Sequence, residues 1–398
     1  MRKKIMILGA GILQLPAIRK AKEMGLQVVA VDMDPNAIGF SEDDVIKEVI
    51  STIDIPGVLE AAKRHKIHGV MTLASDMPMR TVAAVAKEMG LVGITEDTAL
   101  KATNKAAMRQ ALQDYGVPIP KFFKVSNAEQ YRQAVAQMPG AFMVKPADNS
   151  GSRGIIKVED PQNVADVEAA YSYSRGFSRG GDVVVEEYMQ GSEVSVETLT
   201  VDGVCHVIQI TDKLTTGAPY FVEMGHSQPT AHSSEVAEKI RQVAIAANRA
   251  VGIQNGPSHT EIMVTADGPK VVELGARLGG DCITTHLVPL STGVDMVECC
   301  IRIALGQTPQ LEPTLQRGSA IRYFSQTPGV VRAITGLEEA EKMPEIRQIS
   351  IVHGVGQTVE QIRSSGHRLG FVIAQAQDAC GAVEACQRAM EQIHITIE

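Results

Sequence analysis

The sequence predicts a protein of mixed α/β and α+β class, built from three successive domains. Residues 3–100 alternate between strand and helix patterns, which indicates a doubly wound parallel sheet. Residues 191–305 are rich in strands, with hairpin signals at Asp202-Gly203 and Asp267-Gly268. After Glu312-Pro313, which suits a linker, further strands precede an amphipathic helix around residues 382–393. At 398 residues the chain is long enough for two or three packed domains, and we place them at 1–100, 101–310 and 311–398.

Composition and charge narrow the classes of function. The chain has 44% hydrophobic and 21% charged residues, as an ordinary globular protein does. Its formal net charge of -8 argues against nucleic-acid binding as the main task, because phosphate neutralisation needs a basic surface. No apolar run approaches the ~20 residues of a membrane span. The six cysteines show no metal-binding spacing, so we expect buried free thiols and a cytoplasmic protein.

The first domain carries a partial dinucleotide-binding motif. Gly9-Ala10-Gly11 follows the first predicted strand, and Asp32 ends the second. The third glycine of the fingerprint is missing, because Gln14 takes its place. We interpret the motif as a tight strand-to-helix turn in a Rossmann-like domain that binds no dinucleotide. A nucleotide-linked oxidoreductase is the alternative, and bound NAD would favour it.

A phosphate-binding loop is predicted after residues 142–146. This short apolar strand includes Lys145, and residues 148–154 form a run of small residues behind it. Such a loop exposes backbone N–H groups to phosphate oxygens, with the lysine as a point charge beside them. The lysine precedes the glycines, so this is no Walker A motif; the alternative is an ordinary flexible turn. Lys105 is a weaker candidate, because a helix lysine is commonly solvated.

A second strand, at 183–185, leads into a polar run at 186–193. Three valines make the strand a buried one, and its polar end would face a cleft. Backbone groups at such a strand end can pair with an adenine edge, and Glu193 can reach ribose hydroxyl groups. A surface carboxylate cluster is the alternative.

The most informative geometry is a hairpin that carries two glutamates. With a two-residue loop, Glu261 would lie opposite Leu274 and the glutamates would point to opposite faces. A three-residue loop, with Gly268 in the left-handed conformation, shifts the register by one. Glu261 then lies opposite Glu273, with Cβ atoms roughly 5 Å apart. Two such carboxylates suit Mg²⁺, and Arg277 could meet a phosphoryl or carboxylate oxygen in bidentate fashion.

The order of these features resembles the ATP-grasp superfamily over nearly all of the chain. A Rossmann-like domain is followed by a lysine, a second lysine with its glycine-rich loop, an adenine-binding strand, two metal-binding glutamates and an arginine. Within the superfamily, the chain looks most like the L-amino acid ligases that make dipeptides. The motifs that carry this likeness are Ser258-His259-Thr260-Glu261, Phe221-Val222-Glu223-Met224-Gly225-His226 and Arg277-Leu278-Gly279-Gly280-Asp281, and in the tail Tyr323-Phe324, Pro328-Gly329 and Val352-His353-Gly354.

The resemblance implies an ATP-dependent carboxylate–amine ligase that forms an amide through an acyl phosphate, releasing ADP and phosphate, with amino acids as substrates. It implies a pre-ATP-grasp domain at 1–100, an ATP-grasp domain at 101–310 with a mobile lid subdomain at about 118–190, and a C-terminal α+β domain at 311–398. ATP and Mg²⁺ are the expected cofactors, with Mn²⁺ as an alternative metal. The expected partners are small-molecule carboxylate and amine substrates, without nucleic acid or membrane, and a homodimer is compatible with the resemblance.

The resemblance also assigns roles to individual residues. The residues that would hold ATP phosphates are Lys105 and Lys145, under a loop of Ser150, Gly151, Ser152 and Gly154. Those that would meet adenine and ribose are Glu186, Glu187, Tyr188, Met189 and Glu193. The metal ligands would be Glu261 and Glu273. Arg277 would stabilise the acyl phosphate and the tetrahedral intermediate, and the other residues placed with it in the catalytic group are Lys145, Gly279 and Gly280. The residues that would contact substrate are Glu223, His226, His259 and Asp281.

One position departs from the family pattern. Many members place asparagine two residues after the second glutamate, as a further metal ligand, and here that position is Gly275. We expect water or substrate to fill the coordination site. The alternatives to the ligase are an ATP-grasp enzyme with another acceptor, such as a bicarbonate-using carboxylase or a purine-pathway ligase, and an ATP-binding homologue without catalysis. The stretch after Arg277 lacks the Gln-Val-Glu-His of biotin carboxylases, which disfavours that branch.

Overall fold

The computed structural model describes residues 2–149, 153–218 and 220–398, and its N-terminal part is the expected parallel sheet. The strand order is β3-β2-β1-β4, and every pairing is parallel. Helices cover both faces of this sheet, because β1, β2 and β4 are apolar on both sides. The elements are β1 (Lys4–Leu8), α1 (Leu15–Glu23), β2 (Gln27–Asp32), η1 (Ile38–Ser41), β3 (Val45–Val49), α2 (Ile55–His65), β4 (Gly69–Met71), α3 (Met79–Met89) and α4 (Glu96–Thr103).

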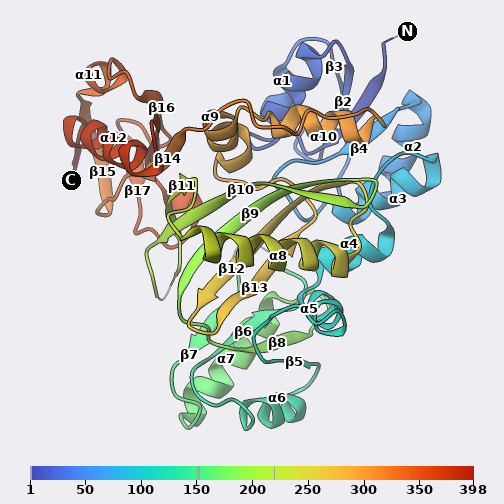
Figure 1. Ribbon diagram of the computed structural model, residues 1–398, viewed down its shortest axis with the longest axis vertical. Coiled ribbons are helices and arrows are strands. Elements are labelled where there is room, and N and C mark those ends of the chain that lie inside the picture. Colours follow the sequence, from blue (N-terminus) through green and yellow to red (C-terminus); the bar gives the residue numbers. More distant parts are fainter. Residues whose placement is uncertain (1, 150–152, 219) are drawn as a thin grey trace.

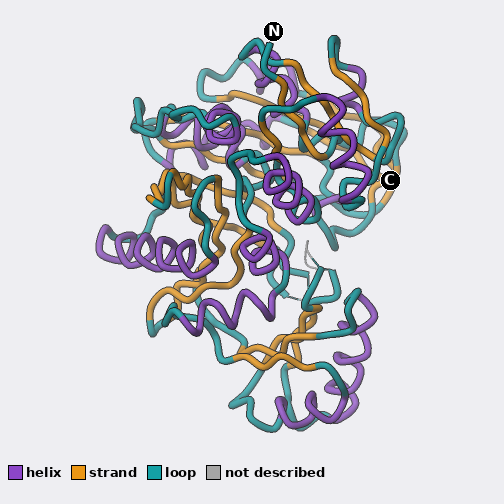
Figure 2. The backbone as a smooth tube through the Cα atoms, turned by 90° about the vertical axis from the view of Figure 1, so that its right-hand side faces the viewer, coloured by secondary structure: helices purple, strands orange, loops and turns teal. Residues whose placement is uncertain are grey.

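The segment predicted as a lid forms a small separate layer. Its four-stranded sheet has the order β5-β8-β6-β7, and it encloses a hydrophobic cluster of its own. Figure 1 and Figure 2 show this layer at the end of the molecule farthest from both termini. Its elements, with the helix that precedes them, are α5 (Lys105–Asp114), β5 (Phe122–Val125), α6 (Ala128–Val135), β6 (Phe142–Pro146), β7 (Ile156–Val158), α7 (Val164–Phe177) and β8 (Val183–Glu187).

One eight-stranded antiparallel sheet runs from the central part into the C-terminal part. Its order is β13-β12-β9-β10-β11-β14-β18-β16, so β11 pairs directly with β14 across the boundary that we placed at residue 310. The central elements are β9 (Ser192–Val201), β10 (Val204–Thr215), β11 (Glu223–Gln228), α8 (Ser234–Val251), β12 (Gly256–Thr265), β13 (Gly268–Gly275), the π-helical η2 (Ile283–Leu287), α9 (Val288–Thr292) and α10 (Met296–Ala304). The C-terminal elements are β14 (Gly318–Tyr323), β15 (Gly329–Thr335), α11 (Leu337–Glu341), β16 (Ile346–Ile351), β17 (Thr358–Val359), η3 (Ser365–His367), β18 (Gly370–Ala376), α12 (Ala379–Gln392) and β19 (His394–Ile397).

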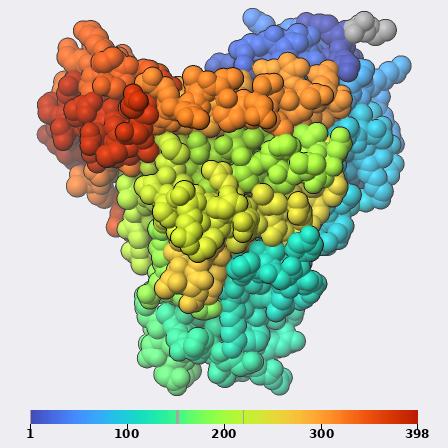
Figure 3. Space-filling view, viewed as in Figure 1, coloured from blue at the N-terminus to red at the C-terminus, as the bar shows by residue number. Residues whose placement is uncertain are grey.

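Helices and the other domains pack against the large sheet. Helix α8 packs on β13, β10 and β12, and α10 packs on α1 and β4 of the first domain. Figure 3 shows the N-terminal and C-terminal lobes on opposite sides of the central sheet, with the lid at the far end. Side chains from three parts of the chain can therefore meet at the hairpin end of the sheet.

The glutamate hairpin has the predicted register, but a β-bulge and not the turn produces it. Glu261 lies opposite Glu273, as we expected. The predicted three-residue loop is wrong: Thr265 pairs with Gly268, so the turn holds two residues. A β-bulge at Val272, between the Ile262 and Glu261 pairings, supplies the one-residue shift.

All six cysteines are free, but they are not uniformly buried as we expected. Cys299, Cys300 and Cys386 are buried, whereas Cys380 is exposed and the other two are partly exposed. Within the described residues, the longest and most apolar helices still fall short of what a membrane span requires.

Candidate functional site

The two hairpin glutamates lie beside two buried lysines. The Nζ atom of Lys105, at the start of α5, is 2.8 Å from Oε1 of Glu273. The Nζ atom of Lys213, in β10, is 3.1 Å from Oε1 of Glu261. Burial raises the pKa of Glu261, but Lys213 and His259 outweigh burial and hold this pKa well below its ordinary value. The Glu261 carboxylate is thus stabilised as an anion, and Glu273 is paired with Lys105.

This donor set fits a magnesium ion. Glu261 and Glu273 offer carboxylate oxygens from adjacent strands. The described residues contain no cluster of three or more histidine, cysteine, aspartate or glutamate side chains suited to a metal ion. Mg²⁺ commonly takes one or two carboxylates and completes its shell with water and phosphate oxygens. A site of this kind would hold the ion only together with a phosphate substrate.

A buried charge cluster joins α5 to the lid. The carboxylate of Glu186, in β8, lies 2.6 Å from Nε of Arg109 and 2.6 Å from Nζ of Lys145, in β6. Burial raises the pKa of Glu186, but the two cations outweigh it and lower the pKa to about 2. The Glu186 side chain is therefore held inside this cluster, and an adenine contact at residue 186 would have to come from its backbone.

Arg109 also holds the bulge that sets the hairpin register. Its Nη1 atom donates to the carbonyl of Val271 at 3.0 Å, and its Nη2 atom donates to that of Val272 at 2.7 Å. A bulge leaves an extra residue outside the regular ladder, so its carbonyl groups need other partners. Arg109 supplies them, and through Glu186 it thereby links Lys145 of the lid to the position of Glu273.

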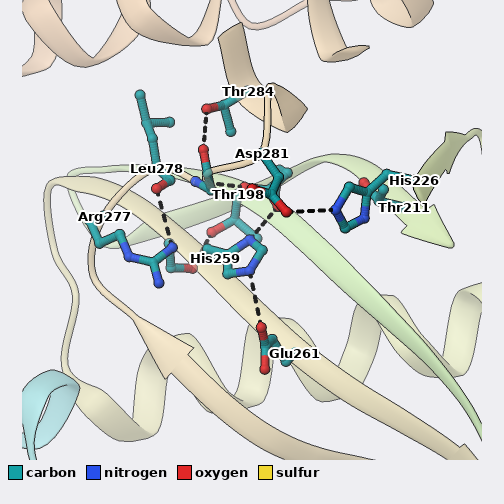
Figure 4. Close-up of polar contacts among 12 residues, drawn as sticks. Thr198, Thr211, His226, His259, Glu261, Arg277, Leu278, Asp281 and Thr284 are labelled. Carbon is teal, nitrogen blue, oxygen red and sulfur yellow. Dashed lines mark hydrogen bonds and ion pairs between the residues drawn. The ribbon is translucent and has the colours of Figure 1, made fainter. Parts of the chain in front are cut away.

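His259 and its partners form the base of the site. Its Nδ1 atom is 2.5 Å from Glu197 Oε1, and its Nε2 atom is 3.6 Å from Glu261 Oε1. Burial lowers the pKa of His259, but Glu197 and Glu261 outweigh it and raise the pKa to about 9. Figure 4 shows His259 pointing toward Glu261, with Arg277 on the other side. His259 is therefore a buried cation that orients the first metal-ligand candidate.

The Gly279 position has no room for a side chain. A Cβ atom there would lie 2.7 Å from Nδ1 of His259 and 2.9 Å from both carboxylate oxygens of Glu197. A Cβ atom at the neighbouring Gly280 would meet only Ala74 Cβ, at 3.8 Å. The first glycine is thus required by the His259–Glu197 pair, and the second is not.

Replacing Gly279 by alanine is expected to destabilise the protein by about 1–3 kcal/mol, because the new methyl group overpacks this pair. Gly280→Ala is the matched control, with an expected change within about 0.5 kcal/mol. Urea unfolding of both variants followed by circular dichroism measures the difference. Equal stability of the two variants would contradict the packing described for Gly279.

Arg277 is held by an aspartate of the first domain. Its Nε atom is 2.9 Å from Oδ1 of Asp76, in the loop between β4 and α3. Burial lowers the pKa of Arg277, but Asp76, Glu261 and Glu273 outweigh it and raise the pKa above its ordinary value. A Cβ atom at Gly275 would lie 2.8 Å from Asp76 Oδ1. The Asp76 carboxylate therefore lies where a side chain at position 275 would begin, and the expectation that water or substrate fills the coordination site stays a prediction.

The predicted substrate contacts Asp281 and His226 lie toward the C-terminal lobe. Asp281 receives two hydrogen bonds from Arg368, at 2.8 and 2.7 Å, and its Oδ2 atom is 3.4 Å from Nε2 of His226. The Nδ1 atom of His226 is buried without a hydrogen-bond partner among the described residues. Asp281 has a positive φ of 50°, a conformation that a non-glycine residue adopts at some energetic cost. Glu223 lies 3.8 Å from Lys213 and so borders both groups.

The remaining predicted ATP contacts lie around the lid. Ser150, Gly151 and Ser152 fall outside the described residues. Gly154 has φ +79°, and a Cβ there would collide with Phe177. Tyr188 lies under Lys157, whose Nζ is 3.8 Å from the ring centroid. The other predicted contacts are placed as follows: Glu187 accepts from the backbone of Lys121, Glu193 lies 2.6 Å from Lys213, and Met189 is partly exposed.

Four residues of this arrangement were missed by the sequence analysis: Arg109, Lys213, Glu197 and Asp76. Only Arg109 had a usable signal, because it follows Lys105 by four residues and so lies on the same helix face. The others come from strands and loops whose neighbours in space are distant in sequence.

Comparisons with known proteins place this geometry in a family context. Residues 138–285 match the family described as ATP-grasp domain, and residues 322–398 match L-amino acid ligase C-terminal domain 2. The L-arginine-specific L-amino acid ligase of Bacillus subtilis is 26% identical, over 70% of this chain and 68% of the relative. The phosphoribosylamine–glycine ligase of Methanothermobacter thermautotrophicus is 25% identical, over 76% of this chain and 73% of the relative. A crystal structure of an L-amino acid ligase from Bacillus licheniformis has the same fold, with a TM-score of 0.86 at 22% identity, and the match covers 100% of this chain and 99% of that one.

Proposed function

Because the chain carries an ATP-grasp domain and an L-amino acid ligase C-terminal domain, and enzymes with this domain use ATP with Mg²⁺, we propose that it is an ATP-dependent carboxylate–amine ligase acting on amino acids. The observation that carries the proposal is the pairing of Glu261 with Glu273 beside Lys105. This pairing brings a magnesium-compatible donor set to the cation that can hold a phosphate.

The proposed reaction begins with activation of a carboxylate. A free carboxylate is a poor acyl donor, and transfer of the γ-phosphoryl group of ATP gives it phosphate as a leaving group. Lys105 and Lys145 would bind phosphate oxygens, which requires Lys105 to exchange part of its contact with Glu273 for the nucleotide. Mg²⁺, held by Glu261 and Glu273, supplies positive charge to the phosphoryl oxygens when it is bound.

Arg277 would act in the second half of the reaction. An amine attacks the acyl phosphate, and negative charge develops on the former carbonyl oxygen. Arg277 is partly buried, cationic and held by Asp76, so it is preorganised for that charge. We place Glu223, His226, His259 and Asp281 at the amino-acid contacts, because they lie between the metal-ligand candidates and the C-terminal lobe.

The test is a coupled ADP-release assay with amino acids offered singly and in pairs. The proposal predicts ADP release only when a carboxylate donor and an amine acceptor are both present, together with the corresponding dipeptide by mass spectrometry. ADP release with bicarbonate alone would contradict the proposal in favour of a carboxylase. Requirement for a phosphorylated sugar amine would contradict its amino-acid half and favour the purine-type relatives.

A further inference from the structure

A cavity of about 420 Å³ lies where the first domain, α4 and the lid meet. Glu273 and Asp76 contribute to its wall, so the cavity borders one of the two predicted metal ligands and the partner of Arg277. Asn104, next to Lys105, lies on the same wall. A molecule in this cavity would present one end to the place where a phosphate is predicted to react.

The acidic groups of the cavity wall already have partners. Glu273 pairs with Lys105, and Asp76 pairs with Arg277. Asp148 accepts from the hydroxyl of Ser178 and the backbone of residues 179 and 180. Burial raises the pKa of Asp148, but these hydrogen bonds outweigh it and lower the pKa below its ordinary value. Each of the three carboxylates of the wall therefore already has a hydrogen-bonding partner within the protein.

Among the described residues, no carboxylate forms an ion pair with either arginine of the wall. Arg80, in the first turn of α3, donates from Nε to the hydroxyl of Thr103 at 3.0 Å. Arg179 follows α7 in the lid, and its backbone N–H is bonded to Asp148. Across residues 2–149, 153–218 and 220–398, neither guanidinium forms an ion pair with a carboxylate. The two guanidinium groups come from different parts of the chain, Arg80 from the first domain and Arg179 from the lid.

The rest of the wall is apolar and partly open to solvent. Ile53 and Leu100 line the cavity and are 52% and 42% exposed, which is high for large aliphatic side chains. Ile55 and Met77 extend the same surface. An apolar ligand part would gain by covering these side chains, whereas a sugar would need polar partners there.

We propose that this cavity binds the amine substrate as an amino acid with an apolar side chain, with its carboxylate held between Arg80 and Arg179. The proposal rests on the proposed function, which supplies the need for an amine. Guanidinium groups recognise both carboxylates and phosphates, and the apolar wall favours an amino-acid carboxylate over the phosphate of a sugar phosphate. Binding would also draw the lid toward the first domain, because each of these parts carries one arginine.

The test is a direct binding measurement that requires no turnover. Isothermal titration of the full chain, with ADP and Mg²⁺ present, compares L-leucine with L-leucinamide, which lacks the carboxylate. The wild type is expected to bind leucine roughly 10- to 100-fold more tightly than the amide, as charge-assisted hydrogen bonds allow. Arg80→Ala and Arg179→Ala should lose that preference, Arg80→Lys should keep part of it, and the surface variant Arg388→Ala should keep all of it.

Three outcomes decide the proposal. Equal preference for leucine in Arg80→Ala and in the wild type would overturn it, even if the enzyme turns over amino-acid pairs. Tight binding of ribose 5-phosphate that depends on Arg80, with no binding of leucine, would keep the anion site and overturn the amino-acid assignment.

In the ADP-release assay, the arginine variants should raise the KM of the acceptor and leave the KM of ATP unchanged. A rise confined to the KM of ATP would make the arginines nucleotide ligands and overturn the proposal.

Discussion

Replacing Arg109 by leucine is expected to lower the free energy of unfolding by about 3–5 kcal/mol, because three hydrogen bonds of one buried guanidinium are lost together. The side chain is 2% exposed and donates to Glu186, Val271 and Val272. Leucine leaves the two carbonyl groups of the bulge without a partner in a place that water does not reach. Urea denaturation followed by circular dichroism measures the loss.

The same substitution should lower ligase activity even at temperatures where the variant remains folded. The bulge sets Glu273 opposite Glu261, and a hairpin without it would move Glu273 to the other face of the sheet. Arg109→Lys tests the geometry separately from the charge, because one ammonium group cannot span all three acceptors. We therefore expect Arg109→Lys to remain folded but to require more Mg²⁺ for half-maximal activity.

A matched surface pair provides the control for Arg109. Arg132 contacts Glu168 at 2.8 Å within the lid, and the two side chains are 64% and 39% exposed. Arg132→Leu should change stability by less than about 1 kcal/mol, since exposed ion pairs contribute little. A folded Arg109→Leu enzyme with wild-type activity and metal dependence would show that the bulge does not depend on this arginine.

The hairpin shows which features the sequence could predict and which it could not. The alternation of apolar residues with Glu261 and Glu273 predicted two strands and a shared face, and the structure has both. The bulge at Val272 lies in an apolar run without glycine or proline, so nothing local marked it. Its partner, Arg109, is 163 residues away. The register was predicted correctly from a turn that the chain does not use.

Other differences between the prediction and the structure also come from contacts between residues that are distant in sequence. Alternating strand and helix patterns predicted the parallel order of the first domain, because βαβ units are local. The pairing of β11 with β14 joins residues almost a hundred positions apart, and it carries one sheet across the predicted boundary. Lys213 and Asp76 reach the site through the same kind of long-range contact. The periodicity of apolar residues and the spacing of turn residues predict individual helices, strands and turns. They do not predict which elements that are distant in sequence pack together.

At Gly275 the chain departs from the family pattern, and the structure shows what surrounds this position. The family pattern that the chain resembles places asparagine there as a metal ligand, so by that pattern Gly275→Asn would add a ligand. In this chain the new Cβ atom would lie 2.8 Å from Asp76 Oδ1 and 3.2 Å from Arg277 Nε. These atoms belong to a partly buried ion pair, and a side chain at position 275 would displace one or both of its members.

We therefore expect Gly275→Asn to lower kcat by roughly 100-fold or more, because a displacement of about 1 Å at a catalytic cation can cost that much. Gly140→Asn is the matched control, since a Cβ at Gly140 meets nothing within 4 Å. The double variant Asp76→Ala with Gly275→Asn should recover part of the activity lost in Gly275→Asn, because removing the Asp76 carboxylate makes room for the asparagine. Coupled ADP release measures all three variants with the same amino-acid pair. A single Gly275→Asn variant that is as active as the wild type would show that Asp76 and Arg277 give way easily, and that Asp76 is not what excludes a side chain from this position.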